Sequence, residues 1–144
     1  MSLKQSRKLC YINNAKVLAE DSHCVRLKVG CVIVLNDNII ASACNGTLPN
    51  RHNCCEVNNA TLPEVVHAEA GAIAKLARST QSSQGAAAFV TTCPCENCAT
   101  LLVTAGITEV YFIDFYRSDA GFILLQEAGV YVEQLNMEEL ERIK

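Results

Sequence analysis

The chain has 144 residues, of which half are hydrophobic and 19% are charged, and it carries a formal net charge of −3 with a pI near 5.6. This length is typical of one domain that buries about two-thirds of its unfolded surface, so we expect a single packed domain over residues 1–144. The acidic balance argues against an extended nucleic-acid surface, and no apolar run is long enough to predict a membrane span, so a small-molecule ligand is favoured.

The chain contains nine cysteines. This number is odd, and the stretch from Met1 to Lys8 is polar and basic rather than apolar like a secretory signal. Both features favour a reducing compartment over a secreted disulfide scaffold. We therefore expect a cytoplasmic location and thiols that are free to bind metal.

In chain order, the first predicted element is a helix from about Ser6 to Glu20, because apolar residues recur there at three- and four-residue steps. Two β-rich runs, 29–35 and 39–43, flank an Asn/Asp-rich turn and predict a hairpin. The segment 44–55 is rich in turn-forming residues and predicts a loop that contacts substrate. A second helix is predicted from Pro63 to Arg78.

After a short polar linker the pattern alternates between strand and helix. It predicts strands over 86–91, 110–114 and 130–132, and helices over 95–104, 119–128 and 137–144. Short crossovers of this kind join parallel strands. We therefore expect an α/β protein, a three-layer α/β/α sandwich around a mixed five-stranded sheet.

Two short motifs carry the chemistry: His67-Ala68-Glu69 and Pro94-Cys95-Glu96-Asn97-Cys98. His67, Cys95 and Cys98 are suitable ligands for Zn²⁺, and a site with three protein ligands leaves a fourth position for water, as in catalytic zinc sites. Glu69 is expected to move protons as general acid and base. The alternatives are a closed structural zinc site or cysteines that pack in the core, but neither explains the carboxylate beside the histidine.

With this spacing, the chain resembles the zinc-dependent cytidine/deoxycytidylate deaminase superfamily. Further segments occur in the order seen in deoxycytidylate deaminases, closest to the short phage and viral ones: 28–33, 44–47, 89–91 and 110–111. The resemblance implies a cytidine deaminase-like fold and hydrolysis of dCMP to dUMP and ammonia, which feeds dTMP synthesis. The alternatives are a bifunctional dCTP/dCMP deaminase, a tRNA or free-base deaminase, and a non-catalytic zinc-stabilised binding module.

Several residues are expected to contact the nucleotide. By resemblance, Asn45 contacts the sugar and Phe115 or Tyr116 lies near the base, while Thr91 belongs to one of the shared segments. For Asn45, followed by glycine, an ordinary tight turn is the alternative.

Two further features concern the phosphate. Arg26 and Lys28 precede the first strand and are suited to pair with a 5′-phosphate, with solvated surface charge as the alternative. Gly71 stands where the family commonly has asparagine, and a glycine inside a helix suggests a close approach to the backbone. More room near the phosphate would favour acceptance of the triphosphate.

A second group of candidate metal ligands lies on two loops and comprises His23, Cys24, His52, Cys54 and Cys55. Some phage deoxycytidylate deaminases carry a second, structural zinc in this region, and Cys24 and Cys54 match by resemblance. No spacing here is a standard zinc motif, so His23, His52 or Cys55 would have to complete such a site, and a second zinc stays open.

The resemblance also implies a homo-oligomer, with a hexamer favoured, and allosteric control by dCTP and dTTP. An exposed apolar face on the helix predicted over 95–104 is one way to build such an assembly.

Overall fold

The computed structural model describes residues 3–143, so Lys144 of the predicted terminal helix lies outside the described residues. Its elements are α1 (Gln5–Glu20), β1 (Gly30–Leu35), β2 (Asn38–Cys44), β3 (Glu56–Val57), β4 (Ala60–Thr61), α2 (Ala68–Leu76), β5 (Ala87–Thr92), α3 (Glu96–Thr104), β6 (Glu109–Asp114), α4 (Ala120–Glu127), β7 (Tyr131–Gln134) and α5 (Met137–Ile143). None of the helices in this described range has the length and apolar character needed to cross a membrane.

Five strands form the main sheet in the order β2-β1-β5-β6-β7. Strand β1 runs antiparallel to both β2 and β5, whereas β5, β6 and β7 are parallel to one another. Helices α3 and α4 form the two crossovers between the parallel strands. The predicted mixed five-stranded sheet is confirmed.

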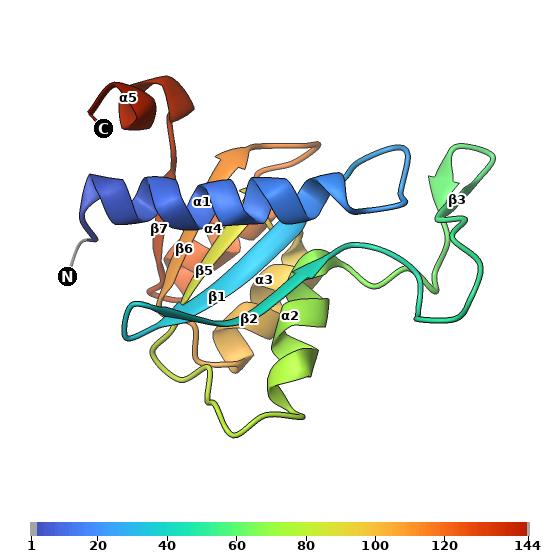
Figure 1. Ribbon diagram of the computed structural model, residues 1–144, viewed down its shortest axis with the longest axis horizontal. Helices are drawn as coiled ribbons and strands as arrows, with labels where there is room; N and C mark the ends of the chain where they lie inside the picture. The colour runs from blue at the N-terminus through green and yellow to red at the C-terminus, as the bar shows by residue number, and fades with distance from the viewer. Residues whose placement is uncertain (1–2, 144) are drawn as a thin grey trace.

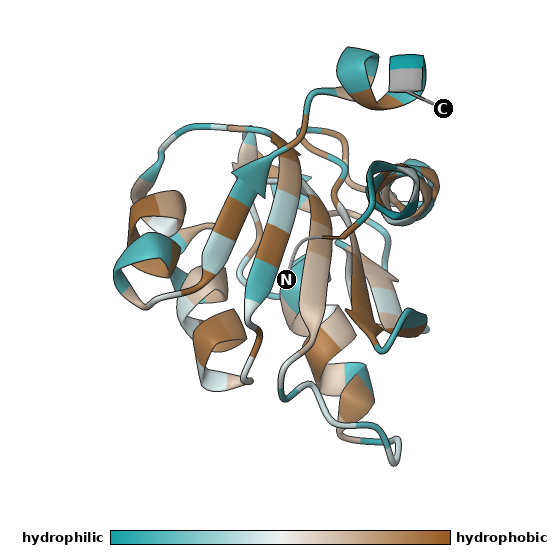
Figure 2. Cartoon of the chain, turned by 90° about the vertical axis from the view of Figure 1, so that its left-hand side faces the viewer, coloured by the Kyte–Doolittle hydropathy of each residue, from teal (hydrophilic) through white to brown (hydrophobic). Residues whose placement is uncertain are grey.

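Helices cover both faces of this sheet (Figure 1). Because side chains alternate along a strand, Cys31 and Ile33 of β1 join one core with α2, α3 and α4, while Val32 and Val34 join a second core with α1 and α5. Figure 2 shows the apolar residues concentrated along the strands between the two helix layers. The sequence prediction of an α/β/α sandwich is therefore confirmed.

Two tight turns depend on asparagine and aspartate. Asn36 and Asp37 have positive φ (51° and 62°), as a type I′ turn requires, and they close the predicted hairpin between β1 and β2. Asn58 and Asn59 do the same (52° and 61°) between β3 and β4. This second hairpin was not predicted, because strands of two residues are too short to show an alternating pattern.

Helix α2 begins at Ala68, not at Pro63 as its sequence pattern predicts. The backbone of Val66 cannot join the helix, because its N–H and carbonyl groups form hydrogen bonds of 2.8 and 3.1 Å with the backbone of Gly46. That bridge keeps the chain extended up to His67. As a result His67 lies at the boundary of the helix instead of inside it.

Candidate active site

The predicted metal ligands lie at the starts of two helices. His67 is the N-cap residue of α2 and Cys95 is the N-cap residue of α3, both with extended backbone. The Cys98 N–H donates to the Cys95 Sγ over 3.5 Å, which fixes the first turn of α3. Helix α2 packs against α3, which brings His67 close to the two thiols. The N-terminus of a helix favours negative charge, so the start of α3 stabilises the thiolate forms of Cys95 and Cys98.

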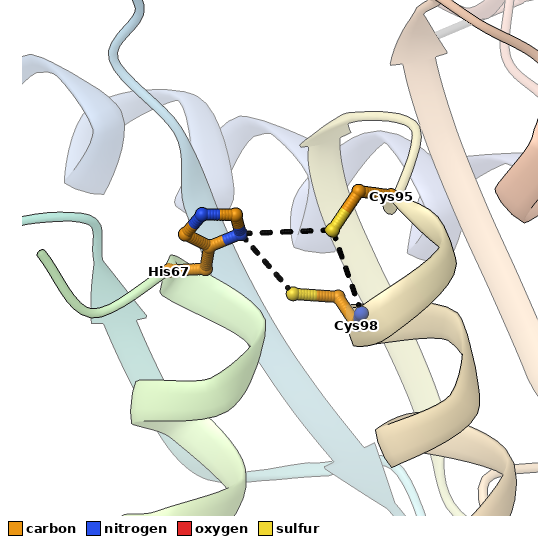
Figure 3. A group of neighbouring side chains, drawn as sticks. All are labelled: His67, Cys95 and Cys98. Carbon is orange, nitrogen blue, oxygen red and sulfur yellow. Dashed lines mark hydrogen bonds between the residues drawn. The ribbon is translucent and has the colours of Figure 1, made fainter. Parts of the chain in front are cut away.

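The three ligand atoms face one another (Figure 3). His67 Nδ1 lies 3.3 Å from Cys98 Sγ and 3.8 Å from Cys95 Sγ, and all three atoms are within 4.8 Å of one another. Around a tetrahedral Zn²⁺ the neighbouring donor atoms would be about 3.5 to 3.8 Å apart. The spacing of this triad therefore fits one zinc ion.

The protonation of the thiols also suits a cation. Contacts with Cys98 and His67 hold the pKa of the Cys95 thiol at about 3, and hydrogen bonding to Cys95 raises the pKa of Cys98. The contact with Cys95 raises the pKa of His67. The pair of thiols thus keeps one negative charge beside an imidazole, and sulfur and nitrogen donors of this kind suit zinc.

Glu69 lies in the first turn of α2 and is only 4% exposed. Burial raises the pKa of its carboxyl group to about 7. A carboxyl group that titrates near neutral pH is suited to both accept and donate a proton. Glu69 is therefore placed and tuned for general acid and base chemistry next to the triad.

His67, Glu69 and Cys95 line a cavity of about 330 Å³. This volume is at the lower end of the range for small-molecule sites. The rest of the wall comes from the loop before β1, from Asn45, from the segment before α2, from the segment between β5 and α3, and from the segment after β6 up to the start of α4. The cavity thus joins the candidate metal site to loops that are distant in sequence.

Among the residues predicted to contact the nucleotide, Arg26, Asn45 and Tyr116 line this cavity. The side-chain amide of Asn45 is engaged with the backbone, since its Oδ1 accepts from the Val29 N–H (2.9 Å) and its Nδ2 donates to the Leu27 carbonyl (2.8 Å). Asn45 therefore shapes the loop that carries Arg26.

The other predicted contacts lie outside the cavity wall. Lys28 is exposed, and Thr91 Oγ1 accepts from the Gly30 N–H over 3.2 Å. Phe115 packs edge-on against Phe112 with ring centres 4.9 Å apart. The close approach expected at Gly71 is made by strand β2, because a Cβ there would lie 3.2 Å from the Ala43 methyl group.

The sequence prediction missed several cavity residues, among them Glu56, Thr61 and Arg117. Arg117 lies three residues beyond the end of β6, and ligands of parallel sheets bind at the carboxyl ends of the strands, so that rule was the available signal. Glu56 and Thr61 belong to the unpredicted β3–β4 hairpin, whose sequence carries no such signal.

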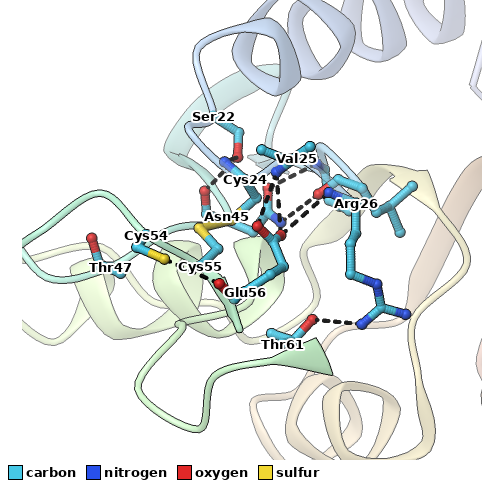
Figure 4. Close-up of a disulfide and its surroundings, with 12 residues drawn as sticks. Ser22, Cys24, Val25, Arg26, Asn45, Thr47, Cys54, Cys55, Glu56 and Thr61 are labelled. Atoms are coloured by element: carbon cyan, nitrogen blue, oxygen red, sulfur yellow. Dashed lines mark hydrogen bonds between the residues drawn. A yellow bond between two sulfur atoms is a disulfide. The ribbon is translucent and has the colours of Figure 1, made fainter. Parts of the chain in front are cut away.

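The second predicted ligand group is dispersed. Cys24 and Cys55 form a disulfide with their Cα atoms 5.2 Å apart, which differs from the expectation of free thiols (Figure 4). Cys54 donates to the Glu56 carbonyl over 3.0 Å, His52 pairs with Glu64, and His23 is exposed. Glu56, which was not predicted as a ligand, lies within ligand distance of both Cys24 and Cys55.

Comparisons with known proteins show the family of this chain. Residues 5–114 match the family model described as the cytidine and deoxycytidylate deaminase zinc-binding region. Deoxycytidylate deaminase from Saccharomyces cerevisiae is 33% identical, over 92% of this chain and 46% of the yeast protein. ComE operon protein 2 from Bacillus subtilis is 31% identical, over 90% of this chain and 71% of the other. The chain thus spans about half the length of the yeast relative.

The fold has a close counterpart among solved structures. The dCMP deaminase from cyanophage S-TIM5, in complex with dCMP and dUMP, superimposes with a TM-score of 0.90 at 38% identity. The superposition covers 93% of this chain and 100% of the cyanophage chain.

Proposed function

The chain belongs to the cytidine and deoxycytidylate deaminase family, and from this premise we propose that it hydrolyses dCMP to dUMP and ammonia, a step that feeds dTMP synthesis. The observation that carries the proposal is the buried carboxyl group of Glu69, in one cavity with the three-ligand site. The cyanophage relative, which was solved with dCMP and dUMP, supports the same substrate.

His67, Cys95 and Cys98 would hold the zinc ion, which when bound acts as a Lewis acid and lowers the pKa of water towards 7. Glu69 would accept a proton from the attacking water and pass it to N3 of the cytosine ring. It would then take the remaining proton from the new C4 hydroxyl group and deliver it to the amine, so that ammonia leaves as the bond between C4 and nitrogen breaks and C4 becomes a carbonyl. Burial suits Glu69 to both steps, because its pKa of about 7 lets it alternate between acid and base.

The nucleotide phosphate would bind between Arg26 and Arg117, which line the cavity from the loop before β1 and the segment after β6. Both cations contact Tyr116: Arg26 donates to its hydroxyl group over 3.3 Å, and the Arg117 guanidinium lies 4.9 Å from its ring centre. Among the described side chains neither arginine forms an ion pair, so both charges are available to an anion.

The test is ammonia release from dCMP, dCTP, CMP, cytidine and cytosine, with and without dTTP. We expect dCMP to be the best substrate, with dCTP turnover deciding whether the enzyme is bifunctional. Turnover confined to the unphosphorylated compounds would refute the proposal.

The matched variant is Glu69→Gln, which keeps the shape of the side chain but cannot exchange protons. Turnover should fall by about 10²- to 10⁴-fold, the usual worth of a general acid and base, while bound zinc and the melting temperature stay unchanged. If dCMP binds to wild type and variant but neither turns it over, the chain is a binding module instead.

We also propose a second zinc ion, but only for the protein in which the disulfide is reduced. Cys24, Cys55 and Glu56 are close enough to share an ion, but the disulfide removes both thiolates. We therefore expect one zinc per chain in the oxidised protein, and two only after the disulfide is reduced. Elemental analysis of both forms tests this.

Assembly as a hexamer and control by dCTP and dTTP are likewise proposals that rest on the family. The helix suggested for an interface, α3, keeps Leu101 and Val103 only half-buried in the single chain. Light scattering with and without each triphosphate measures the subunit number and any response to the effectors.

A further inference from the structure

The Cys24–Cys55 disulfide lies at the wall of the cavity, since Cys24 is one of its lining residues. It connects two loops that are 31 residues apart in sequence, the loop between α1 and β1 and the segment that leads into the β3–β4 hairpin. Both cysteines are 1% exposed. The adjacent Cys54 is an exposed, unpaired thiol.

Hydrogen bonds continue the connection on either side of the disulfide. The carboxylate of Glu56, next to Cys55, accepts the backbone N–H of Val25 over 3.2 Å and that of Arg26 over 3.3 Å. Figure 4 shows this carboxylate directly beneath the backbone that leads from Cys24 to Arg26. One covalent bond and these hydrogen bonds therefore hold three successive residues of the first loop.

The segment between Gly46 and Val66, which contains Cys55 and Glu56, has few other contacts with the rest of the chain. Its ends meet at the Gly46–Val66 bridge, and Figure 1 shows its β3–β4 hairpin standing apart from the main sheet. On the cavity side it contributes Thr61, whose hydroxyl group accepts a hydrogen bond of 3.3 Å from Arg26. The position of the Arg26 guanidinium thus depends on the same two loops that the disulfide joins.

We propose that Cys24–Cys55 is a reversible thiol–disulfide pair that positions Arg26, so that oxidation strengthens and reduction weakens binding of the phosphate-bearing substrate. The part that concerns affinity rests on the proposed function. The metal ligands and Glu69 are held by α2 and α3 instead, so the pair acts on binding and leaves the chemical step intact.

The exchange partner is a low-molecular-weight thiol of the glutathione class. One thiolate attacks a sulfur of the pair and forms a mixed disulfide, and a second thiolate attacks that mixed disulfide and releases the oxidised partner. The bond between Cys24 and Cys55 breaks, one between the two partner molecules forms, and the cysteines gain two electrons and two protons. Oxidation is the reverse.

The test equilibrates protein that carries one zinc ion per chain in buffers of reduced and oxidised glutathione without free zinc, so that no second ion can rejoin the two loops after reduction. Peptide mapping by mass spectrometry after alkylation reports the pairing, and KM and kcat for dCMP are measured in each buffer. We expect a Cys24–Cys55 bond in oxidising buffer, a KM for dCMP about tenfold higher in reducing buffer, and kcat within about twofold, the KM change being worth about 1.4 kcal/mol.

Three variants separate this role from a general effect on folding. Cys55→Ser should have the high KM in both buffers, whereas Cys54→Ser should keep the bond and the redox response. Cys10→Ser, which removes an exposed thiol on α1, should behave like wild type. Binding of dCMP to the Glu69→Gln variant, followed by calorimetry, gives the affinity without turnover.

Each result decides the proposal. Equal dCMP affinity in both buffers, a pairing that uses Cys54, or no Cys24–Cys55 peptide under oxidising conditions would overturn it. If dCMP is bound with redox-dependent affinity but never deaminated, the proposed reaction is wrong while the redox pair stands.

Discussion

Tyr116 is the residue on which the substrate side of the cavity depends, because it contacts both Arg26 and Arg117, the two cations that we propose bind the phosphate. Arg26 can be predicted from the sequence as a site residue, since it precedes a predicted strand. Charge alone does not identify Arg117 as a site residue, because the chain has 12 lysines and arginines and most of them are exposed to solvent. Only the topology of β5 and β6 places Arg117 beside the zinc site.

We therefore expect Arg117→Ala to raise KM for dCMP by about 10- to 100-fold, since a charge-assisted contact to phosphate is worth about 1.5–3 kcal/mol. The KM for cytidine, which has no phosphate, should stay unchanged. Steady-state kinetics on both substrates gives the comparison. Lys28→Ala is the matched control, because Lys28 is an exposed cation outside the cavity wall. A larger effect of Lys28→Ala than of Arg117→Ala would contradict this assignment.

At the scale of elements, the long periodic segments were predictable and their ends were not. The strands β5 and β6 and the helix between them follow apolar patterns that the sequence displays directly. The start of α2 depends on a backbone bridge between Gly46 and Val66, which are 20 positions apart and carry no local signal. The contact between the loop that contains Cys24 and the loop that contains Cys55 likewise joins positions 31 residues apart, and no local sequence pattern predicts it.

Gly30 gives a prediction at this scale, because it is where α1 meets the start of β1. A Cβ on Gly30 would lie 1.9 Å from the Ala15 carbonyl oxygen, so α1 would have to move. Gly30→Ala should cost about 3 kcal/mol of unfolding free energy and lower Tm by about 10 °C. Calorimetry or circular dichroism measures this.

The control for that substitution is Gly71→Ala. Its Cβ would lie 3.2 Å from the Ala43 methyl group, a contact that small shifts can relieve, and alanine is favoured in a helix by about 1 kcal/mol. Gly71→Ala should therefore change Tm by no more than about 3 °C. Similar losses in both variants would show that the packing of α1 is not what Gly30 serves.

For the molecule as a whole, the candidate zinc site is the point where α2 and α3, the two helices on one face of the sheet that carry the sequence motifs, are joined into one unit. His67 caps α2, Cys95 caps α3, and the second of these helices is also covered by α4. The sequence predicts the ligands because the functional residues of each motif, His67 with Glu69 and Cys95 with Cys98, lie within four consecutive positions. Their meeting requires the sheet, since β5 delivers Cys95 beside the start of α2.

Removal of the metal should therefore affect stability as well as activity. If zinc is present at about 100 times its dissociation constant, binding adds about 2.7 kcal/mol to the unfolding free energy. Stripping the protein with a chelator should then lower Tm by about 8 °C, and adding zinc back should restore it. Cys98→Ser should bind zinc more weakly and lose most of this response, whereas Cys10→Ser should keep it. A Tm that is the same with and without zinc would mean that the ion does not join α2 to α3, because an ion held by both helix starts must stabilise the folded chain by its binding free energy.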